Sequence, residues 1–531
     1  MNSNAQINPI IPGFAPDPSL VLVGDTYFLV NSTFHLFPGL PIYTSKDLVH
    51  WTQIGNAINR TEQLSLAKSA TRINFFEDGD HMYATGGLYA PTIRYHEGTF
   101  YVVCTNVIRH GDKPSDDELQ NFIVSTTDIY KGKWSDPVFF EFNGIDTSLF
   151  WDTDGKVYIS GSKSPGPMTK VMLFEIDLVT GAKLTEEKEL WPGTGGIYPE
   201  GPHIYLKNGF YYLMIAEGGT HEGHMVTMAR SRSIFGPYEA SPENPILTAA
   251  GTDEYVQCTG HCEAFEDKNG EWWGVCLAIR KGADLLYGLG RETFLVKGHW
   301  TEDGWLKFDR AKTHLSVPGV QVKEEERLTA VPDVDLLYIH DPELSRYTIY
   351  SQPKGSPTNY VLTASAHDFH APEASPTFVG KRQRLMTGTS SVEFKDLKFS
   401  TVDKAFTHAG LAVYKDEHRF LRIFIAGETM KVVFEIVNKA KQIERSVEHQ
   451  LDGKSGDFKL VVSYTEQEYR ASVVVGGDKT VELGKVDAMD LSAKDFVGPI
   501  IGLFAFADRD GTEDRAREVW FSNFVVDNKA T

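Results

Sequence analysis

Three acidic residues occupy similar places in a repeated pattern of the sequence. Asp17 in APDPS, Asp146 in GIDTS and Glu200 in YPEGPH each precede a turn glycine by seven to nine residues. Asp17 lies between two prolines, and Glu200 lies between a proline and a Gly-Pro pair, so stiff, extended backbone holds both acids. An acid that only needs solvation does not require such a rigid position. The placement therefore indicates carboxylates with a chemical role, although a single acid of this kind would read as a turn former.

A cluster of carboxylates has two leading chemical uses, glycoside hydrolysis and the binding of a divalent metal. In an inverting hydrolysis, a carboxylic acid with a raised pKa protonates the leaving oxygen, while an ionised carboxylate activates water. Aromatic side chains near the strand starts could stack on sugar rings or could pack between strands. These aromatic residues are Phe14, Phe34, Phe37, Tyr89 and Trp151.

The elements that must position the acids are short strands joined by tight turns. A small turn residue plus glycine, followed by aromatic and strand-prone residues, recurs five times, as in VGDTYFLV, HEGTFYVV and KNGFYYLM, and the glycines are 54–74 residues apart. Repeated units that cannot bury their faces alone favour a closed radial array. We therefore expect a five-bladed β-propeller, whose first strands line the channel and bring the acids together. A large, irregular β-sandwich is the alternative.

A second domain is expected after a change of composition. The charged segment VKEEERLTAVPDVD reads as a linker or a solvated edge, and it precedes short strand-like runs such as AGLAVYK, FLRIFIA and KVVFEIV. We expect an all-β protein with a five-bladed β-propeller catalytic domain over residues 1–322 and a β-sandwich domain over residues 335–531. Helices should be short and few.

Composition and charge limit the classes of protein. The 531 residues are 41% hydrophobic and 23% charged, which is typical of a globular chain of two or three domains. The net charge of −20 argues against nucleic acid or an anionic membrane surface as a partner. The chain has neither an apolar run that could span a bilayer nor a recognisable signal segment, so a soluble, cytoplasmic protein is expected, with a secreted mature form as the alternative.

Four ordered motifs resemble glycoside hydrolase family 43. They are the segment from NPIIPGFAPDPS to SKDLVHW, GIDTSLFWDTDGKVY, YPEGPHIYLKNGFYYLMIAEGGT and LGRETFL. The resemblance is to the β-xylosidase and α-L-arabinofuranosidase branch, and it implies that the C-terminal β-sandwich is concanavalin-like. It also implies that Asp17 is the general base, that Glu200 is the general acid, and that Asp146 orients Glu200 and keeps its pKa high. The family usually has a proline where this chain has Thr147.

The resemblance implies further site residues. Arg291 in LGRET would hydrogen-bond sugar hydroxyls, and a structural salt bridge is the alternative role. Phe34 and Tyr89 would shape the sugar subsite, although the family often has tryptophan at the second position. Thr220 would contact the base or the sugar. His261 in CTGHCEAF resembles a histidine of the central channel, which implies water or a structural Ca²⁺ ion there.

Zinc is not expected beside His261. The flanking cysteines, Cys258 and Cys262, lack the paired spacings of a full four-ligand set, and the four cysteines of the chain are too few for a disulfide framework. We expect buried thiols. The resemblance implies no required cofactor.

The predicted function is that of an exo-acting, inverting glycosidase. It would release xylose from β-1,4-xylooligosaccharides, with L-arabinofuranose from arabinoxylan as a second product. The alternatives are a debranching α-L-arabinofuranosidase and an endo-acting arabinanase or xylanase. A catalytically silent carbohydrate-binding protein is the alternative outside the enzymes, and the oligomeric state is left open.

Overall fold

The computed structural model describes residues 6–528 except 165, 283–285, 351–357, 399–407, 428, 430, 452–454, 478 and 508–517. Within these residues nearly all regular structure is strand, and the helices are single 3₁₀ turns, which confirms the all-β class. The turns are η1 (Pro114–Asp116), η2 (Ile129–Lys131), η4 (Glu324–Glu326), η5 (Leu344–Arg346) and η6 (Ala488–Asp490). None of the described helices is long and apolar enough to cross a membrane.

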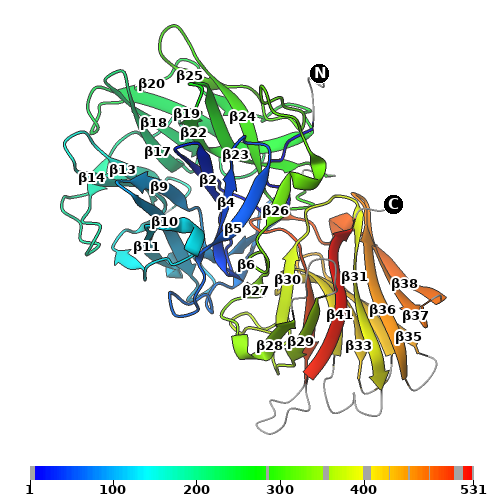
Figure 1. The fold of residues 1–531 in the computed structure, drawn as a ribbon. Helices are drawn as coiled ribbons and strands as arrows, with labels where there is room; N and C mark the ends of the chain where they lie inside the picture. The colour runs from blue at the N-terminus through cyan, green and yellow to red at the C-terminus, as the bar shows by residue number, and fades with distance from the viewer. Residues whose placement is uncertain are drawn as a thin grey trace.

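The N-terminal part consists of five sheets that follow one another around a centre, as the blades of a propeller (Figure 1). Blade one contains β1 (Ser19–Val23), β2 (Thr26–Val30), β4 (Gly39–Ser45), β5 (Trp51–Ile58) and β26 (Leu328–Ala330). Blade two contains β8 (Gly87–Leu88), β9 (Thr92–His96), β10 (Thr99–Ile108), β11 (Glu118–Thr126) and β12 (Val138–Phe140). Blade three contains β13 (Gly144–Trp151), β14 (Val157–Lys163), β15 (Lys170–Glu175) and β16 (Lys188–Glu189).

Blades four and five complete the ring, and the predicted five-bladed propeller is confirmed. Blade four contains β17 (Glu200–Lys207), β18 (Phe210–Glu217), β19 (Met225–Ser231), β20 (Glu239–Ala240) and β21 (Leu247–Thr248). Blade five contains β22 (Val256–Glu266), β23 (Trp272–Arg280), β24 (Glu292–Trp300) and β25 (Leu306–Phe308).

The five repeated glycines form the first hairpin turn of each blade. All five have positive φ angles between 62° and 85°, a conformation that L side chains rarely adopt. A Cβ atom on Gly24, Gly98 or Gly155 would meet no other atom within 4 Å, so backbone conformation rather than space requires glycine there. The repeat seen in the sequence is thus a repeat of turn geometry. The five residues are Gly24, Gly98, Gly155, Gly209 and Gly270.

The N-terminal segment closes the ring by pairing with blade five. The backbone N–H of Ile10 donates to the carbonyl oxygen of Thr293, and the Asn8 side chain donates to the carbonyl oxygen of Leu295 at 2.8 Å. The backbone N–H of Ala15 donates to the carbonyl oxygen of Arg291 at 3.0 Å. Closure therefore brings the start of blade one beside Arg291, although these residues lie at opposite ends of the propeller sequence.

The C-terminal part is a sandwich of two antiparallel sheets (Figure 1). The seven-stranded sheet has the order β28 (Tyr347–Tyr350), β29 (Asn359–Thr363), β41 (Glu518–Asn528), β31 (Gly388–Lys398), β36 (Ser455–Tyr464), β37 (Glu468–Val475) and β38 (Lys479–Asp487). The six-stranded sheet has the order β30 (Phe378–Arg382), β40 (Ile500–Phe506), β32 (His408–Asp416), β33 (Arg419–Ala426), β34 (Lys431–Asn438) and β35 (Ile443–Gln450). The predicted β-sandwich is therefore confirmed.

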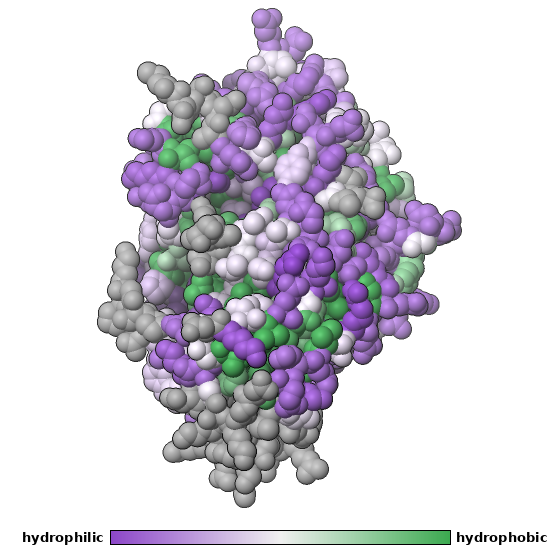
Figure 2. All heavy atoms as spheres, turned by 90° about the vertical axis from the view of Figure 1, so that its right-hand side faces the viewer, coloured by the Kyte–Doolittle hydropathy of each residue, from purple (hydrophilic) through white to green (hydrophobic). Residues whose placement is uncertain are grey.

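Two small sheets join the propeller to the sandwich. One pairs β3 (Leu36–Phe37) with β27 (Tyr338–Ile339). The other has the order β39 (Lys494–Asp495), β7 (His81–Thr85) and β6 (Thr71–Phe75), so a strand from the sandwich sequence pairs with a hairpin of the propeller sequence between blades one and two. Seen from the side on which the sandwich lies, the surface is largely hydrophilic with smaller hydrophobic patches, in keeping with the net charge of −20 (Figure 2).

Candidate active site

The three predicted acids lie where the first strands of three blades begin. Asp17 lies two residues before β1, and Glu200 is the first residue of β17. Asp146 lies in β13 at an irregularity of the pairing between Ile145 and Ser148. Asp17 and Asp146 are buried, with exposed fractions of 5% and 8%. The repeat therefore places the acids at the starts of the first strands of blades one, three and four, and the three carboxylates are close enough to shift one another's pKa values.

A left-handed residue interrupts the extended backbone at these strand starts. The φ angle is 51° at Asp17, 56° at Asp146, 57° at Gly201 and 42° at His261. Non-glycine residues take this conformation at some energetic cost and are concentrated at functional sites. Glu200 lies one position before the left-handed residue of its own blade. Glu200 is therefore offset by one residue from the positions that Asp17 and Asp146 take in the repeat. Counting residues to the turn glycine did not reveal this offset.

Burial and mutual repulsion raise the pKa values of two of the acids, Asp146 and Glu200. Burial raises the pKa of Asp146 to about 6, with a further rise from Asp17 that His261 opposes. Burial also raises the pKa of Glu200 well above its usual range, and the neighbouring charges of Asp146 and Asp17 raise it further. Two carboxylates that share a low-dielectric site cannot both ionise easily. Glu200 is thus suited to hold a proton that it can donate.

Asp17 is held by donors on both of its carboxylate oxygens. Nη1 of Arg291 lies 3.3 Å from Oδ1, and the hydroxyl of Ser32 donates to Oδ2 at 2.9 Å. The same Nη1 atom donates to the hydroxyl of Thr220 at 3.1 Å. Arg291 is 4% exposed, so this fork of donors acts in a buried site. The structure therefore joins Arg291 and Thr220 to the base that sequence analysis predicted, and Arg291 does form the alternative salt bridge, with Asp17.

Aromatic rings form a wall beside Arg291. The ring of Phe34 lies 5.1 Å from that of Tyr89, and the phenol oxygen of Tyr89 accepts a hydrogen bond from Arg109. Phe496, which comes from the sandwich, lies 5.6 Å from Phe34 and 6.0 Å from Tyr89 between ring centroids. Its carbonyl oxygen accepts a hydrogen bond of 3.2 Å from Nη2 of Arg291. Both parts of the chain thus build this wall.

Not every aromatic residue near a strand start belongs to the wall. Phe14 stacks on Phe34 at 6.1 Å. Phe37 is 4% exposed in a hydrophobic core, and Trp151, at the far end of β13, stacks on His96. Phe37 and Trp151 therefore contribute to the packing of the fold rather than to the wall.

Sequence analysis missed Phe496, Ser32 and Arg109. Ser32 and Arg109 lie in or beside propeller strands whose pattern carries no chemical signal. Phe496 directly follows β39, which pairs with β7 of the propeller sequence about 400 residues away, and this brings it to the site.

His261 lies in the channel beside the acids. Its Nδ1 atom is 3.9 Å from Oδ2 of Asp146, and its ring makes an edge contact with that of His203. His203 and His224 are buried, and their Nε2 atoms have no hydrogen-bond partner. Calcium takes six to eight oxygen ligands, so these imidazoles and one carboxylate do not form a calcium cage and suit water better. Within the described residues, no group of three or more His, Cys, Asp or Glu side chains could hold a metal ion.

The four cysteines are free and buried. Burial raises the pKa of the Cys258 thiol to about 12. These are the buried thiols that the sequence predicted.

Comparisons with known proteins identify the family. Glycosyl hydrolases family 43 matches residues 7–306, and the beta xylosidase C-terminal concanavalin A-like domain matches residues 336–524. The chain is 33% identical to the non-reducing end alpha-L-arabinofuranosidase BoGH43B of Bacteroides ovatus, over 98% of this chain and 95% of that protein. It is also 33% identical to a xylosidase/arabinosidase of Butyrivibrio fibrisolvens, over 94% of this chain and 95% of that protein.

A solved structure agrees with both domains. A variant of the family 43 protein BlXynB of Bacillus licheniformis superposes with a TM-score of 0.83 at 30% identity, covering 97% of this chain and 98% of that chain. The concanavalin-like character of the sandwich, implied by the resemblance, is therefore confirmed. The chain is a glycosidase that belongs to glycosyl hydrolase family 43.

Proposed function

We propose that this glycosidase is an exo-acting, inverting enzyme that releases xylose from β-1,4-xylooligosaccharides, with L-arabinofuranose from arabinoxylan as its second product. Glu200 is the general acid, Asp17 is the general base, and Asp146 orients Glu200 and raises its pKa. One observation carries this assignment. A half-buried glutamic acid with a raised pKa lies near an aspartate that accepts hydrogen bonds from Arg291 and Ser32.

The proposed reaction is a single displacement. Asp17 removes a proton from water, whose oxygen forms a bond to the anomeric carbon. The bond from this carbon to the glycosidic oxygen breaks, and Glu200 gives its proton to the departing oxygen. The sugar leaves with inverted configuration, Glu200 is ionised and Asp17 is protonated. Proton exchange with solvent restores both residues.

The wall of the pocket supports the choice of a single terminal sugar. Phe496 faces Phe34 and Tyr89, so the sandwich narrows the space in front of Arg291. A narrow, one-sided pocket favours exo action over the open groove of an endo-acting enzyme. Arg291 presents nitrogens that can pair with neighbouring hydroxyls of a pentose. The names of the two relatives include both activities, which supports xylooligosaccharides and arabinoxylan as the substrate class and debranching arabinofuranosidase as the second candidate.

No step of this mechanism depends on a metal. The calcium ion implied for the channel remains a prediction, and His261 would be its protein contact, with water supplying the other ligands. Metal analysis of the purified protein tests it.

The experiment compares two leaving groups. Initial rates are measured for xylobiose and for 4-nitrophenyl β-D-xylopyranoside, and 4-nitrophenyl α-L-arabinofuranoside is measured in parallel to rank the sugars. Glu200→Gln should lower kcat on xylobiose about 10²–10⁴-fold and should affect the nitrophenyl xyloside less, because nitrophenolate leaves without a proton. Asp17→Asn should lower both rates to a similar extent, because water must be activated in either case.

Glu187→Gln is the matched control. Glu187 pairs with Lys163 and Lys183 at the edge of blade three, so this change should leave both rates as they are. Full turnover of xylobiose by Glu200→Gln would refute the assignment, and a reversed pattern would exchange the roles of the two acids. Products longer than one sugar from xylan would favour the endo-acting alternative.

A further inference from the structure

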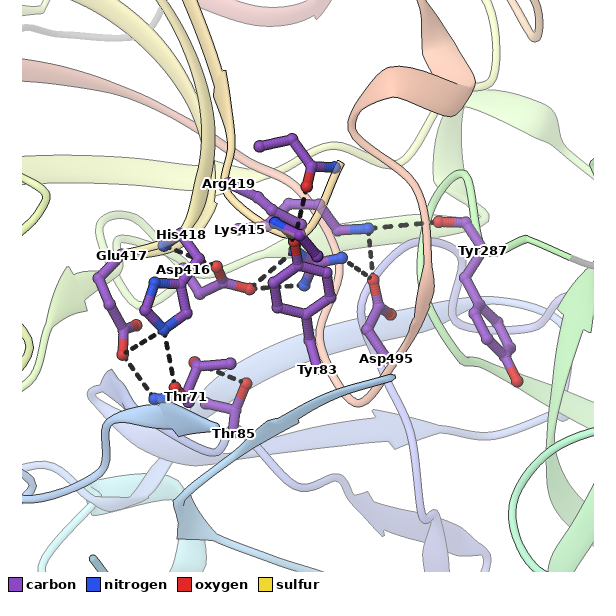
Figure 3. A network of polar contacts seen from close by, with 12 residues as sticks. Thr71, Tyr83, Thr85, Tyr287, Lys415, Asp416, Glu417, His418, Arg419 and Asp495 are labelled. Carbon is purple, nitrogen blue, oxygen red and sulfur yellow. Dashed lines mark hydrogen bonds and ion pairs between the residues drawn. The ribbon is translucent and has the colours of Figure 1, made fainter. Parts of the chain in front are cut away.

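A buried cluster of charged side chains lies between the sandwich and the hairpin of β6 and β7 (Figure 3). The sandwich contributes the turn from β32 to β33, with Lys415, Asp416 and Arg419, together with Asp495 of β39. Side chains of Asp416, Arg419 and Asp495 have no exposed surface, and that of Lys415 is 2% exposed. The guanidinium of Arg419 also lies over the ring of Tyr83 from β7, at 3.8 Å.

Asp495 accepts from two cations at once. Nζ of Lys415 lies 2.7 Å from its Oδ2 atom, and Nη1 of Arg419 lies 2.5 Å from the same oxygen. Nε and Nη2 of Arg419 bind Oδ2 of Asp416 at 3.0 and 2.5 Å. Two acids and two bases thus balance one another, and each is fixed by the others. A buried ion cluster of this kind is weak evidence for stability, but it does define one position for each member.

The strand that carries Asp495 is also tied to the propeller by other contacts. Lys494 and Asp495 pair in parallel with Met82 and Tyr83 of β7. The ammonium of Lys494 lies 2.9 Å from Asp80 and 2.7 Å from Glu222. These contacts fix the backbone immediately before Phe496.

Phe496 is the next residue, and it belongs to the candidate active site. Its ring packs against Phe34 and Tyr89, and the guanidinium carbon of Arg291 lies 5.1 Å from the ring centre. Its carbonyl oxygen accepts from Arg291, which in turn contacts Asp17. One short chain of contacts therefore runs from the ion cluster to the general base.

We infer that Asp495 is a positioning residue that holds Phe496 across the sugar pocket and so sets substrate affinity. Lys415 and Arg419 anchor its carboxylate, and the backbone carries this anchorage to the pocket wall and to the Arg291 contact. The inference rests on the proposed function, because it needs the sugar to bind beside Phe496. The contacts of Arg291 with Asp17 and Thr220 do not involve Phe496. A change at Asp495 should therefore act mainly on KM.

The experiment measures KM, kcat and the midpoint of thermal unfolding of the full chain, with the nitrophenyl glycoside that the wild-type protein hydrolyses faster. Asp495→Asn should raise KM about three- to tenfold while kcat changes less. This pattern is expected when a variant weakens the binding of the substrate and of the transition state equally. Phe496→Ala should show the same split, because it removes the wall itself.

Two further variants separate positioning from stability. Asp495→Asn alone leaves an excess buried cation and is expected to lower the unfolding midpoint. The double variant Asp495→Asn, Lys415→Met restores the charge balance, so it should recover most of the midpoint and still show the raised KM. Asp368→Asn is the matched control, because it removes a carboxylate that pairs with buried Arg422 inside the sandwich at 2.6 Å. It should lower the midpoint without changing KM.

Wild-type KM in the double variant would overturn the inference, as would an equal rise of KM in Asp368→Asn. The failure of the proposed function gives a different result. In that case Glu200→Gln would retain turnover of xylobiose, whereas the KM comparison among the Asp495 variants does not depend on which residue donates the proton.

Discussion

The protein holds two polar clusters in which different partners shift the pKa values of Asp146 and Asp416 in opposite directions. In the candidate active site, burial raises the pKa of Asp146 to about 6 and raises that of Glu200 well above its usual range. In the cluster between the domains, burial alone would raise the pKa of Asp416, but Arg419 lowers it below its usual value. Desolvation raises the pKa at both sites, and the partners differ.

The comparison shows how one fold keeps one acid protonated and another ionised. Carboxylates of the active site share their space with each other, and Arg291 makes its direct contact with Asp17. In the interdomain cluster, two carboxylates are balanced by Lys415 and Arg419. Like charges at the first site favour protonation and proton transfer, and opposite charges at the second favour one fixed geometry. Three changes test this contrast.

The largest effect is expected from breaking the balanced cluster. Arg419→Met leaves Asp416 and Asp495 buried with Lys415 as the remaining cation, so it should lower the free energy of unfolding by about 3–5 kcal/mol. Urea denaturation followed by fluorescence measures this loss. Arg445→Met is the control, because Arg445 pairs with Asp490 at an exposed site and should cost less than about 1 kcal/mol. Similar losses in the two variants would mean that the buried cluster is not specially coupled.

The propeller could be predicted because its repeat is local. A glycine with positive φ and the strands beside it lie within about a dozen residues, so their pattern is visible in the sequence. The acids could be predicted for the same reason, since Asp17 and Glu200 lie in rigid, recognisable phrases at strand starts. The one-residue offset of Glu200 could not be predicted, because a β-bulge changes the register of a strand without leaving a mark in its amino-acid composition.

The interdomain contacts could not be predicted from the sequence. The run KDEHR at residues 415–419 has the composition of a solvated turn, yet Asp416 and Arg419 are fully buried. Their burial depends on the pairing of β39 with β7, two strands that are separated by about 400 residues in the sequence. Phe496 was missed for the same reason. A local pattern carries no information on a contact of this range.

A smaller effect, of opposite sign at the two sites, is expected when single aspartates are neutralised. The pKa of Asp146 is raised in the folded protein, so its ionisation removes stability as pH rises from about 4 through about 6. Asp146→Asn should therefore raise the free energy of unfolding at pH 8 by up to about 3 kcal/mol and should have little effect near pH 4. The asparagine can still accept from the Gly201 backbone N–H, which donates to Asp146 in the wild type.

Asp416→Asn is the matched counterpart. The folded-state pKa of Asp416 is lowered, so its contribution is present above the unfolded pKa and is lost as pH falls through the folded pKa. Asp416→Asn should therefore lower stability at pH 8. Thermal unfolding at pH 4.5 and pH 8 measures both variants. If Asp146→Asn is destabilising at pH 8, the repulsion in the active site does not weaken the fold, and the contrast between the clusters fails.

The smallest effect concerns the pH dependence of turnover. With Glu200 as the proposed general acid, activity should fall as pH rises through its pKa, because the acid must carry its proton. Asp146→Asn removes a neighbouring negative charge, so the pKa of Glu200 should fall and the basic limb of kcat/KM should move to lower pH by about one unit. Asp177→Asn, on the outer turn after β15, should leave this limb in place. An unmoved limb in Asp146→Asn would mean that burial alone holds the proton on Glu200. Proton transfer at this site would then depend on desolvation of the site. The sandwich, which contributes Phe496 to the pocket wall, would then influence the pKa of Glu200 as well as the affinity for the sugar.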